Sequence, residues 1–438
     1  FEGGSIRWEK NSKTFLSHSK DFNEYFHQAP REKGGKELQG WGINNSSFNE
    51  RNGIKVETIF KGIQFPTSMA FLDSNDFLVL EKNNGTVQRI KDGEMYPEPL
   101  IDVNVANMRE RGMLGIAIHE GTGNIPTYVF LYFTESRNKD VDNIAEESLV
   151  LGNNLYRYEL SENGTKLTNP KLLLSLPSES SSIHNGGKLV ISSDENLYLV
   201  VGDLGTRETT TQNSINGSMP DGTSVIYRLT KDGEAASDNP FSEMPMLSKY
   251  YAYGIRNSFG IDFDPITGKM WNTENGEGNF DEINIVEPGF NSGWKKLMGM
   301  APSGFNFSNL AEFGGIGKYS DPEFVWNISI GVTALKFFHS DKLGPVYKDG
   351  LLVGDFVNGN LYFFQLNDNR TELLLRGPLA DKIADDPEEL NEYILASGLG
   401  GITDIQVDPD GYLYISAIKR YYPLIDTDGI IYRIIPGD

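Results

Sequence analysis

Short runs of alternating apolar and polar residues, separated by turns rich in Gly, Asp and Asn, recur along most of the chain. The first set covers residues 69–90, the last covers residues 403–434, and four similar sets lie between them. Alternation with a period of two is typical of β-strands, because successive side chains of a strand point to opposite faces. Each set holds three or four such runs, which predicts a small antiparallel sheet.

The six sets follow one another at intervals of about 60 residues, each with the same strand order. The four middle sets cover residues 114–158, 187–229, 259–285 and 334–364. This repeat is typical of the four-stranded blades of a β-propeller, whereas a sandwich or a barrel does not restart its strand order. We therefore predict an all-β fold, a six-bladed β-propeller of four-stranded antiparallel blades, over residues 54–438.

Residues 1–53 do not share the pattern and are predicted to form an irregular N-terminal extension. The segment is polar and charged, with isolated apolar residues such as Trp8, Phe15 and Trp41. Two interpretations stay open for it. It is either a strap or tail outside the propeller, or an arm that docks on a neighbouring molecule and allows self-assembly.

The composition narrows the choice of partner and compartment. The chain has a net charge of −22, which disfavours nucleic acid and anionic membranes, and it has no cysteine for disulfides or nucleophilic catalysis. No apolar stretch reaches the roughly 18 residues that span a bilayer. N-glycosylation sequons begin at Asn44, Asn45, Asn84, Asn163, Asn216, Asn306, Asn327 and Asn369. These features favour a secreted protein, extracellular, at the cell surface or periplasmic, that carries N-linked glycans.

Four polar motifs interrupt the strand pattern, and in a propeller such loops gather at one end of the central channel. The first contains His184, which is suited to take a proton from a substrate hydroxyl or, alternatively, to cap a turn. The second contains Asp203 between glycines, where an acid either orients a histidine or caps its own turn.

The third motif contains Arg256 and Asn257, whose guanidinium and amide groups suit carboxylates or quinone oxygens. Its alternative role is a structural ion pair. The fourth motif, residues 273–282, mixes glycines with acidic residues, a composition that suits Ca²⁺. The order of its residues does not match an EF-hand loop.

Taken together and in this order, the motifs resemble those of soluble glucose/sorbosone dehydrogenases, a family that includes aldose dehydrogenases using pyrroloquinoline quinone (PQQ). The stretches 110–117, 288–294 and 408–414 add to the resemblance. It implies a small sugar or alcohol substrate, and PQQ and Ca²⁺ as cofactors. It also implies that His184 takes the proton of the substrate hydroxyl as hydride leaves, with Asp203 supporting the histidine.

The resemblance implies roles for the other motif residues as well. Arg256 acts with the catalytic pair, and both Arg256 and Asn257 contact the quinone and the reacting oxygen. Glu110 lies at the edge of the pocket. The backbone at Gly276 and Glu277 supplies carbonyl ligands to Ca²⁺.

The sequence departs from the family where the cofactor is held. Quinone-binding members carry a lysine where this chain has residues 356–359, and two arginines where it has residues 401–404. The resemblance therefore implies that Thr403 is the residue that faces the cofactor in this stretch. Asn275 and Glu277 replace a histidine and a proline. PQQ carries three carboxylates, so the loss of three cations weakens its binding. The added carboxylate of Glu277 repels PQQ and favours a metal ion.

Whether the chain is an enzyme therefore stays open, since one fold serves many functions. The first reading is an exported PQQ- and Ca²⁺-dependent sugar or alcohol dehydrogenase. The second is a non-catalytic secreted propeller, a glycan-binding or surface-assembly subunit that has lost the quinone-binding cations. The third is a metal-dependent lactonase or esterase on the same architecture.

Overall fold

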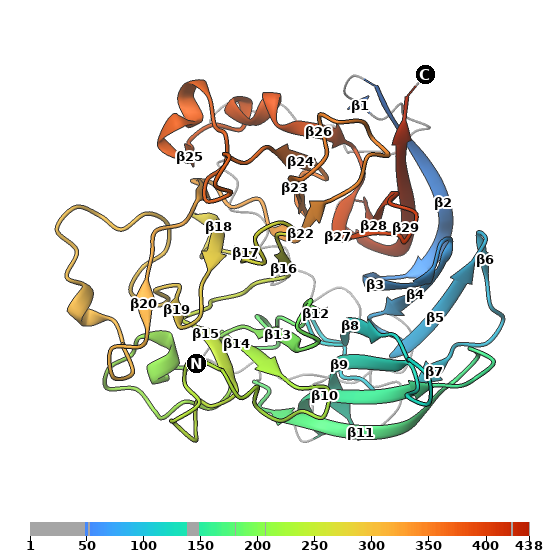
Figure 1. Cartoon of the computed structure of the whole chain (residues 1–438), viewed down its shortest axis with the longest axis horizontal. Helices are drawn as coiled ribbons and strands as arrows, with labels where there is room; N and C mark the ends of the chain where they lie inside the picture. The colour runs from blue at the N-terminus through green and yellow to red at the C-terminus, as the bar shows by residue number, and fades with distance from the viewer. Residues whose placement is uncertain are drawn as a thin grey trace, which may run out of the picture. The chain divides into compact units, whose positions relative to one another are not determined.

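The computed structural model describes residues 49–50, 53–137, 149–179, 181–205, 207–421 and 424–437. These residues form six small, mostly antiparallel sheets around a common centre (Figure 1). This arrangement confirms the predicted six-bladed β-propeller, which lies within the unit Gly40–Asp438. Most of the predicted extension, together with the sequons at Asn44 and Asn45, lies outside the described residues.

Blades one to three follow the chain from the centre outward. Blade one contains β3 (Pro66–Asp73), β4 (Asp76–Glu81), β5 (Thr86–Lys91), β6 (Glu94–Met95) and β7 (Ile101–Asp102). Blade two contains β8 (Met113–His119), β9 (Tyr128–Ser136), β10 (Val150–Leu160) and β11 (Leu167–Leu176). Blade three contains β12 (Leu189–Ile191), β13 (Leu197–Val201), β14 (Val225–Leu229) and β15 (Tyr250–Tyr253), followed by the parallel strands β19 (Phe290–Asn291) and β20 (Lys318–Tyr319).

Blades four to six repeat this order. Blade four contains β16 (Gly260–Phe263), β17 (Met270–Glu274), β18 (Asp281–Val286), β21 (Phe324–Trp326) and the parallel β25 (Ile383–Ala384). Blade five contains β22 (Val332–Phe338), β23 (Gly350–Asp355), β24 (Leu361–Phe364), β26 (Ile394–Ser397) and β1 (Asn49–Glu50). Blade six contains β27 (Gly401–Val407), β28 (Leu413–Tyr421), β29 (Leu424–Pro436) and β2 (Ile54–Gln64). Short 3₁₀ helices cover Thr210–Gln212, Phe307–Asn309, Gly377–Asp381 and Pro387–Glu392.

The first strands of the blades close into a ring at the centre. Each of β3, β8, β12, β16, β22 and β27 contacts the next, and β27 contacts β3. Because the strand order repeats, the beginnings of the first strands and the ends of the second strands lie on one face. We call this face the site face, since the loop before β12 and the loop after β13 carry His184 and Asp203.

The ring is closed by pairing between distant parts of the chain. β2 is the outermost strand of blade six and pairs antiparallel with β29, from Ile54 opposite Pro436 to Gln64 opposite Asp428. β1 pairs with β26 of blade five, although its residues belong to the predicted extension. The predicted boundary between residues 53 and 54 stays a prediction. None of the helices in the described ranges has the length and apolar character needed to cross a membrane.

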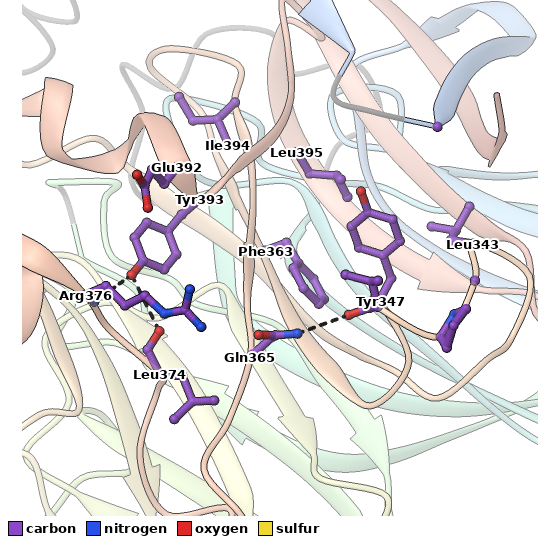
Figure 2. Close-up of a pocket in the computed structure, with 14 residues that line it drawn as sticks. Leu343, Tyr347, Phe363, Gln365, Leu374, Arg376, Glu392, Tyr393, Ile394 and Leu395 are labelled. Atoms are coloured by element: carbon purple, nitrogen blue, oxygen red, sulfur yellow. Dashed lines mark hydrogen bonds between the residues drawn. The ribbon is translucent and has the colours of Figure 1, made fainter.

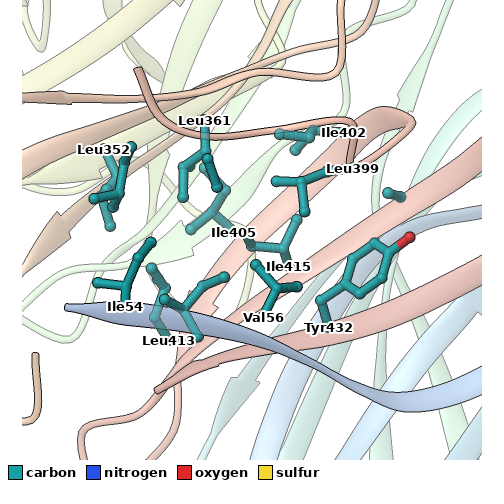
Figure 3. Packing of buried hydrophobic residues seen from close by; sticks show 14 of the residues in the cluster. Ile54, Val56, Leu352, Leu361, Leu399, Ile402, Ile405, Leu413, Ile415 and Tyr432 are labelled. Carbon is teal, nitrogen blue, oxygen red and sulfur yellow. The ribbon is translucent and has the colours of Figure 1, made fainter. Parts of the chain in front are cut away.

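The apolar core lies between neighbouring blades. Figure 3 shows one such layer, in which Leu352 and Leu361 of blade five pack with Ile405 and Leu413 of blade six. These four side chains are at most 1% exposed. Burying one large aliphatic side chain stabilises a fold by about 1.5–3 kcal/mol relative to leaving it exposed. The alternation in the sequence therefore marks the residues that each strand presents to the next blade.

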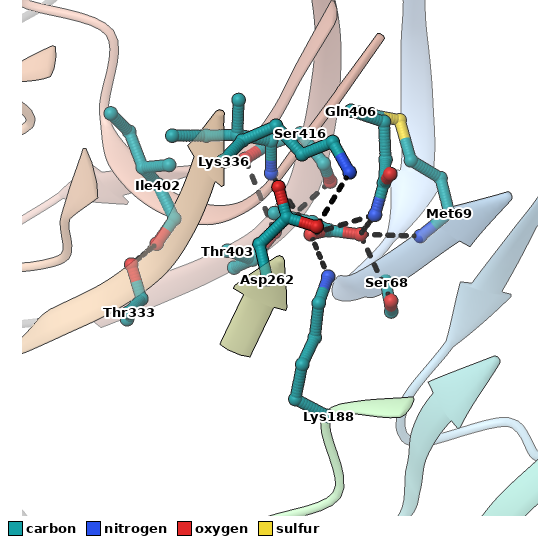
Figure 4. A network of polar contacts seen from close by, with 12 residues as sticks. Ser68, Met69, Lys188, Asp262, Thr333, Lys336, Ile402, Thr403, Gln406 and Ser416 are labelled. Atoms are coloured by element: carbon teal, nitrogen blue, oxygen red, sulfur yellow. Dashed lines mark hydrogen bonds and ion pairs between the residues drawn. The ribbon is translucent and has the colours of Figure 1, made fainter. Parts of the chain in front are cut away.

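The centre of the propeller holds charged side chains (Figure 4). Lys188, just before β12, forms an ion pair with Asp404 of β27, and their side chains are only 6% and 1% exposed. Asp404 also accepts a hydrogen bond of 2.9 Å from the hydroxyl of Ser68 in β3. A second pair joins Lys336 of β22 to Asp262 of β16 at 3.0 Å. These contacts join five of the six blades across the ring.

Candidate functional site

The loop before β12 holds His184 in a backbone conformation that few residues adopt. Ser182 and His184 have φ angles of 61° and 58°, in the left-handed region. Gly186 follows with a φ of 63°, and a Cβ at this position would lie 2.5 Å from the carbonyl oxygen of Val200. Glycine at 186 therefore lets the loop lie against β13. Such strained backbone persists where the surrounding structure enforces it, and it is often found at functional sites.

His184 and Asp203 form a buried pair. Nδ1 of His184 lies 2.5 Å from Oδ1 of Asp203, and the residues are 4% and 1% exposed. Asp203 also accepts hydrogen bonds from the backbone N–H of Gly205 at 2.7 Å and the indole N–H of Trp294 at 2.6 Å. Burial by itself would raise the pKa of Asp203, but hydrogen bonds from His184 and Gly205 and the charge of Arg256 hold it below its usual value. The carboxylate thus accepts the Nδ1 proton, which leaves Nε2 of His184 to accept a proton from a ligand.

Arg256 lies beside this pair. Its carbonyl accepts the backbone N–H of Asp203 at 2.8 Å, and its own backbone N–H donates to Glu274 at 2.6 Å. The guanidinium donates from Nη1 to the carbonyl of Asn275 at 2.8 Å and lies 5.3 Å from the ring centroid of Trp294. The side chain is thereby fixed at the end of β17, next to the histidine pair.

Glu110 connects the first and third motifs. Its Oε2 accepts the backbone N–H of His184 at 2.7 Å and a hydrogen bond from Nδ2 of Asn257 at 3.2 Å. One carboxylate oxygen therefore fixes the histidine loop against the neighbouring motif. The structure thus brings together five predicted site residues: Glu110, His184, Asp203, Arg256 and Asn257.

Lys82 belongs to this arrangement, although the sequence motifs did not include it, and so does Trp294, the last residue of the stretch 288–294. Nζ of Lys82 donates to the carbonyls of Asn107 and Arg111 at 3.0 and 2.8 Å, and so holds the loop that carries Glu110. Burial lowers the pKa of Lys82 to about 7, against the opposing influence of Glu110. A lysine directly after the buried strand β4 was the available signal for this role, because a lysine there must find polar partners.

Several buried polar atoms around the pair have no hydrogen-bond partner among the described residues. They are Nδ2 of Asn185, Oε1 of Gln212, Nε of Arg256 and Oδ1 of Asn257. Asn185 follows His184 directly, and Nε2 of Gln212 donates to the carbonyl of Asp203 at 3.3 Å. An unsatisfied buried polar group costs about 1–3 kcal/mol. These two donors and two acceptors are therefore suited to a polar ligand held beside His184.

Thr403 makes its hydrogen bonds within blade six. Its hydroxyl is 3.2 Å from the carbonyl and 3.0 Å from the hydroxyl of Ser416 in the neighbouring strand. In the part of the chain that the structure describes, no hydrogen bond joins it to His184 or Arg256. Its predicted place on the cofactor side stays a prediction.

The fourth motif forms a tight loop between β17 and β18. The backbone N–H of Gly276 donates to Asp281 at 2.9 Å, and a Cβ on this glycine would collide with the carbonyl of Asn279. Glu277 is exposed. Among the described residues, no hydrogen bond reaches the carbonyl of Gly276 or Glu277, and no group of three or more His, Asp or Glu side chains could hold a metal ion. A Ca²⁺ ion here would depend on backbone carbonyls, as predicted.

Blades five and six place a carboxylate beside or at the end of each stretch where the resemblance implies cations. Asp355, the last residue of β23, accepts the backbone N–H groups of Asn358 and Gly359 at 2.5 and 2.8 Å. Burial raises the pKa of Asp355 to about 7, although these hydrogen bonds lower it. Asp404 is held by Lys188. The stretches 356–359 and 401–404 therefore lack the cations that the resemblance implies for three carboxylates.

Replacing Asp355 with asparagine is expected to remove a loss of stability that the wild type undergoes as the pH rises from about 4 to about 7. The folded-state pKa of about 7 is above the ordinary 3.8, so the protonated group stabilises the fold at low pH, and this contribution is lost as the pH rises through about 7. Asparagine keeps an acceptor for both N–H groups and does not ionise. In urea unfolding, the free energy of unfolding of the variant relative to wild type should rise by about 1–3 kcal/mol between pH 5 and pH 9. A constant difference would contradict the assignment.

The sequence and the fold of this chain are similar to those of known sugar dehydrogenases. The family model described as "Glucose / Sorbosone dehydrogenase" matches residues 63–422. Aldose sugar dehydrogenase YliI of Escherichia coli (strain K12) is 26% identical over 374 residues, which cover 83% of this chain and 89% of the relative.

Solved structures show the same fold at low sequence identity. The apo form of the soluble aldose sugar dehydrogenase of Escherichia coli superposes with a TM-score of 0.67 at 22% identity, covering 88% of this chain and 100% of the other. The PQQ-bound aldose sugar dehydrogenase of Streptomyces coelicolor gives a TM-score of 0.63 at 23% identity, covering 88% and 99%.

Proposed function

Because the chain belongs to the glucose/sorbosone dehydrogenase family, we propose that it is a sugar or alcohol dehydrogenase in which His184 is the catalytic base. The observation that carries the proposal is the buried pair of His184 and Asp203, joined at 2.5 Å. A histidine oriented by a carboxylate is suited to proton abstraction, because the carboxylate fixes the tautomer and stabilises the imidazolium that forms.

The substrate hydroxyl would give its proton to Nε2 of His184 while the carbon bearing it loses hydride. Asp203 keeps the Nδ1 proton in place through this step, and its own hydrogen bonds from Gly205 and Trp294 keep the carboxylate oriented. Glu110 fixes the backbone of His184. The chain's residues therefore position the substrate and hold the proton at one defined nitrogen.

We propose PQQ and Ca²⁺ as cofactors, since relatives of this fold include a PQQ-bound enzyme. The free Nε of Arg256 and Oδ1 of Asn257 would hold the quinone, and the carbonyls of Gly276 and Glu277 would hold the cation. Bound quinone would supply the acceptor for the hydride. Because cations are lacking at blades five and six, the affinity for a tricarboxylate is expected to be lower than that of a complete clamp.

Titration of chelator-treated protein with PQQ and Ca²⁺ tests this proposal. We expect saturable binding in the quinone absorbance, and dye reduction with aldoses that requires both additions. Thr403→Arg is expected to lower the Kd for PQQ about tenfold, because it restores one charge-assisted hydrogen bond. Lack of both binding and dye reduction at micromolar PQQ, in the wild type and in this variant, would contradict the proposal.

The second candidate is a non-catalytic secreted propeller, either a glycan-binding module or a subunit of a surface assembly. The stretches 356–359 and 401–404 favour it, because they lack the lysine and the two arginines that a quinone clamp needs. Self-assembly through residues 1–53 belongs to this candidate and concerns residues mostly outside the described ranges. Ordered assemblies in solution together with absent PQQ binding would support it.

We also propose that the protein is exported and glycosylated. The asparagines of five sequons are exposed, and they are Asn84, Asn163, Asn216, Asn306 and Asn369. Asn84 and Asn163 lie in turns between neighbouring strands, where a glycan would not disturb packing. A mass shift on enzymatic deglycosylation of the natively produced protein would support this, and an unshifted mass would contradict it.

A further inference from the structure

Blade five carries a groove at its outer edge, on a different blade from His184 (Figure 2). The groove has a volume of about 620 Å³. One wall is the segment from Leu343 to Tyr347 between β22 and β23, and the other is the segment 392–395, where β26 begins. A volume of this size is typical of sites for small molecules.

Aromatic side chains form much of the groove. Tyr347 and Phe363 meet edge to face, with ring centroids 5.1 Å apart, and Tyr393 stacks on Phe364 at 5.2 Å. Tyr347, Phe363 and Tyr393 are each half-buried, so that part of each side chain stays open to the solvent. The C–H faces of a pyranose ring pack favourably on such planar apolar surfaces, which flexible aliphatic side chains do not provide.

Polar side chains surround these aromatic rings. Gln365, Arg376 and Glu392 line the same groove and are exposed. They present an amide, a guanidinium and a carboxylate, which together can donate to and accept from neighbouring hydroxyl groups. The guanidinium and the carboxylate balance in charge, so the groove is matched to a neutral ligand.

The walls are held by contacts that need no ligand. Nε2 of Gln365 donates to the carbonyl of Val346 at 3.4 Å, across the groove. The hydroxyl of Tyr393 accepts the backbone N–H of Arg376 at 2.9 Å. Because these bonds hold each wall to its neighbouring segment, binding would require little reorganisation.

We propose that this groove binds a neutral oligosaccharide, in a site separate from the one that contains His184. The combination of half-buried aromatic surfaces with amide, guanidinium and carboxylate ends carries the inference. The site would hold a glycan chain or a surface polysaccharide and keep the protein close to it. The proposal stands whether or not the propeller oxidises sugars.

Binding of cellobiose, maltose and mannobiose, measured by ligand-detected NMR and calorimetry without PQQ, tests the proposal. Wild-type protein is expected to bind at least one of them saturably. Val346→Trp fills the groove from an exposed position and should abolish binding, and Arg376→Ala should weaken it about tenfold. Phe307→Ala removes an exposed aromatic residue outside the groove and should leave binding unchanged.

Two outcomes would overturn the proposal. One is the absence of binding to all three sugars at millimolar concentration. The other is binding that Val346→Trp and Arg376→Ala leave unchanged, since such binding belongs to another site. NMR and calorimetry measure binding without dye reduction. The absence of oligosaccharide binding is therefore distinguishable from the absence of the proposed dehydrogenase activity.

Discussion

Replacement of His184 by alanine is expected to lower kcat/KM for sugar oxidation by about 10²–10⁴-fold in protein reconstituted with PQQ and Ca²⁺. The variant loses the only nitrogen that Asp203 orients toward a ligand, so the hydroxyl proton must leave to water. The loss is expected in kcat/KM measured by dye reduction, with quinone binding changed much less. Added imidazole should restore part of the activity, because it can enter the space that the side chain vacates.

Asp203→Asn is the matched control for this experiment. It keeps the size of the side chain, but its amide no longer accepts the Nδ1 proton as a carboxylate does, so the histidine is held in the wrong tautomer more often. We expect a loss of activity that imidazole does not relieve. If His184→Ala keeps wild-type activity under saturating cofactor, the histidine is not the base and the proposed mechanism is wrong.

Breaking the central ion pair is expected to have the largest effect on stability. Lys188→Met leaves the carboxylate of Asp404 buried without its cation, and removal of one partner of a buried pair costs about 3–5 kcal/mol. Urea unfolding measures the loss. The double variant Lys188→Met/Asp404→Asn should recover much of it, because no unpaired charge remains and the amide oxygen still accepts from Ser68 and Met69.

The exposed pair of Lys269 and Glu287, joined at 2.7 Å, provides the control. Glu287→Gln should change the free energy of unfolding by less than about 1 kcal/mol, because exposed pairs are screened by solvent. If Lys188→Met also lowers the free energy of unfolding by less than about 1 kcal/mol, the central pair does not hold the blades together, contrary to the interpretation of Figure 4.

The sequence predicted the blades because their central strands depend on local alternation. β4 and β13 fall within the predicted sets, but both are continuous apolar runs, because both faces of each strand are buried. The two-residue strands β1, β6, β7, β19, β20 and β25 were not predicted. Such strands have no pattern of their own, because they form only where another segment offers its edge.

The site was predicted in part for a similar reason. Loop motifs with glycines marked His184 and Asp203, and the structure brings them together. The hydrogen bond from Trp294 to Asp203 spans 91 positions in the sequence, and that from Asn257 to Glu110 spans 147. Contacts of this kind follow from the stacking of blades, so a pattern along the chain does not reveal them.

Closure of the ring by β2 has a consequence for how the protein is made. Gln64 of β2 contacts Asp428 across 364 sequence positions, so β2 leaves the ribosome long before its partner β29. At roughly 5–20 residues per second, this interval lasts about 20–70 s. The other five blades can pair their own strands in that time, but β2 presents an open edge that invites association with other chains. Nascent protein that is truncated before β29 therefore cannot close the ring. Cellular quality control of such a fragment would meet an exposed strand β2.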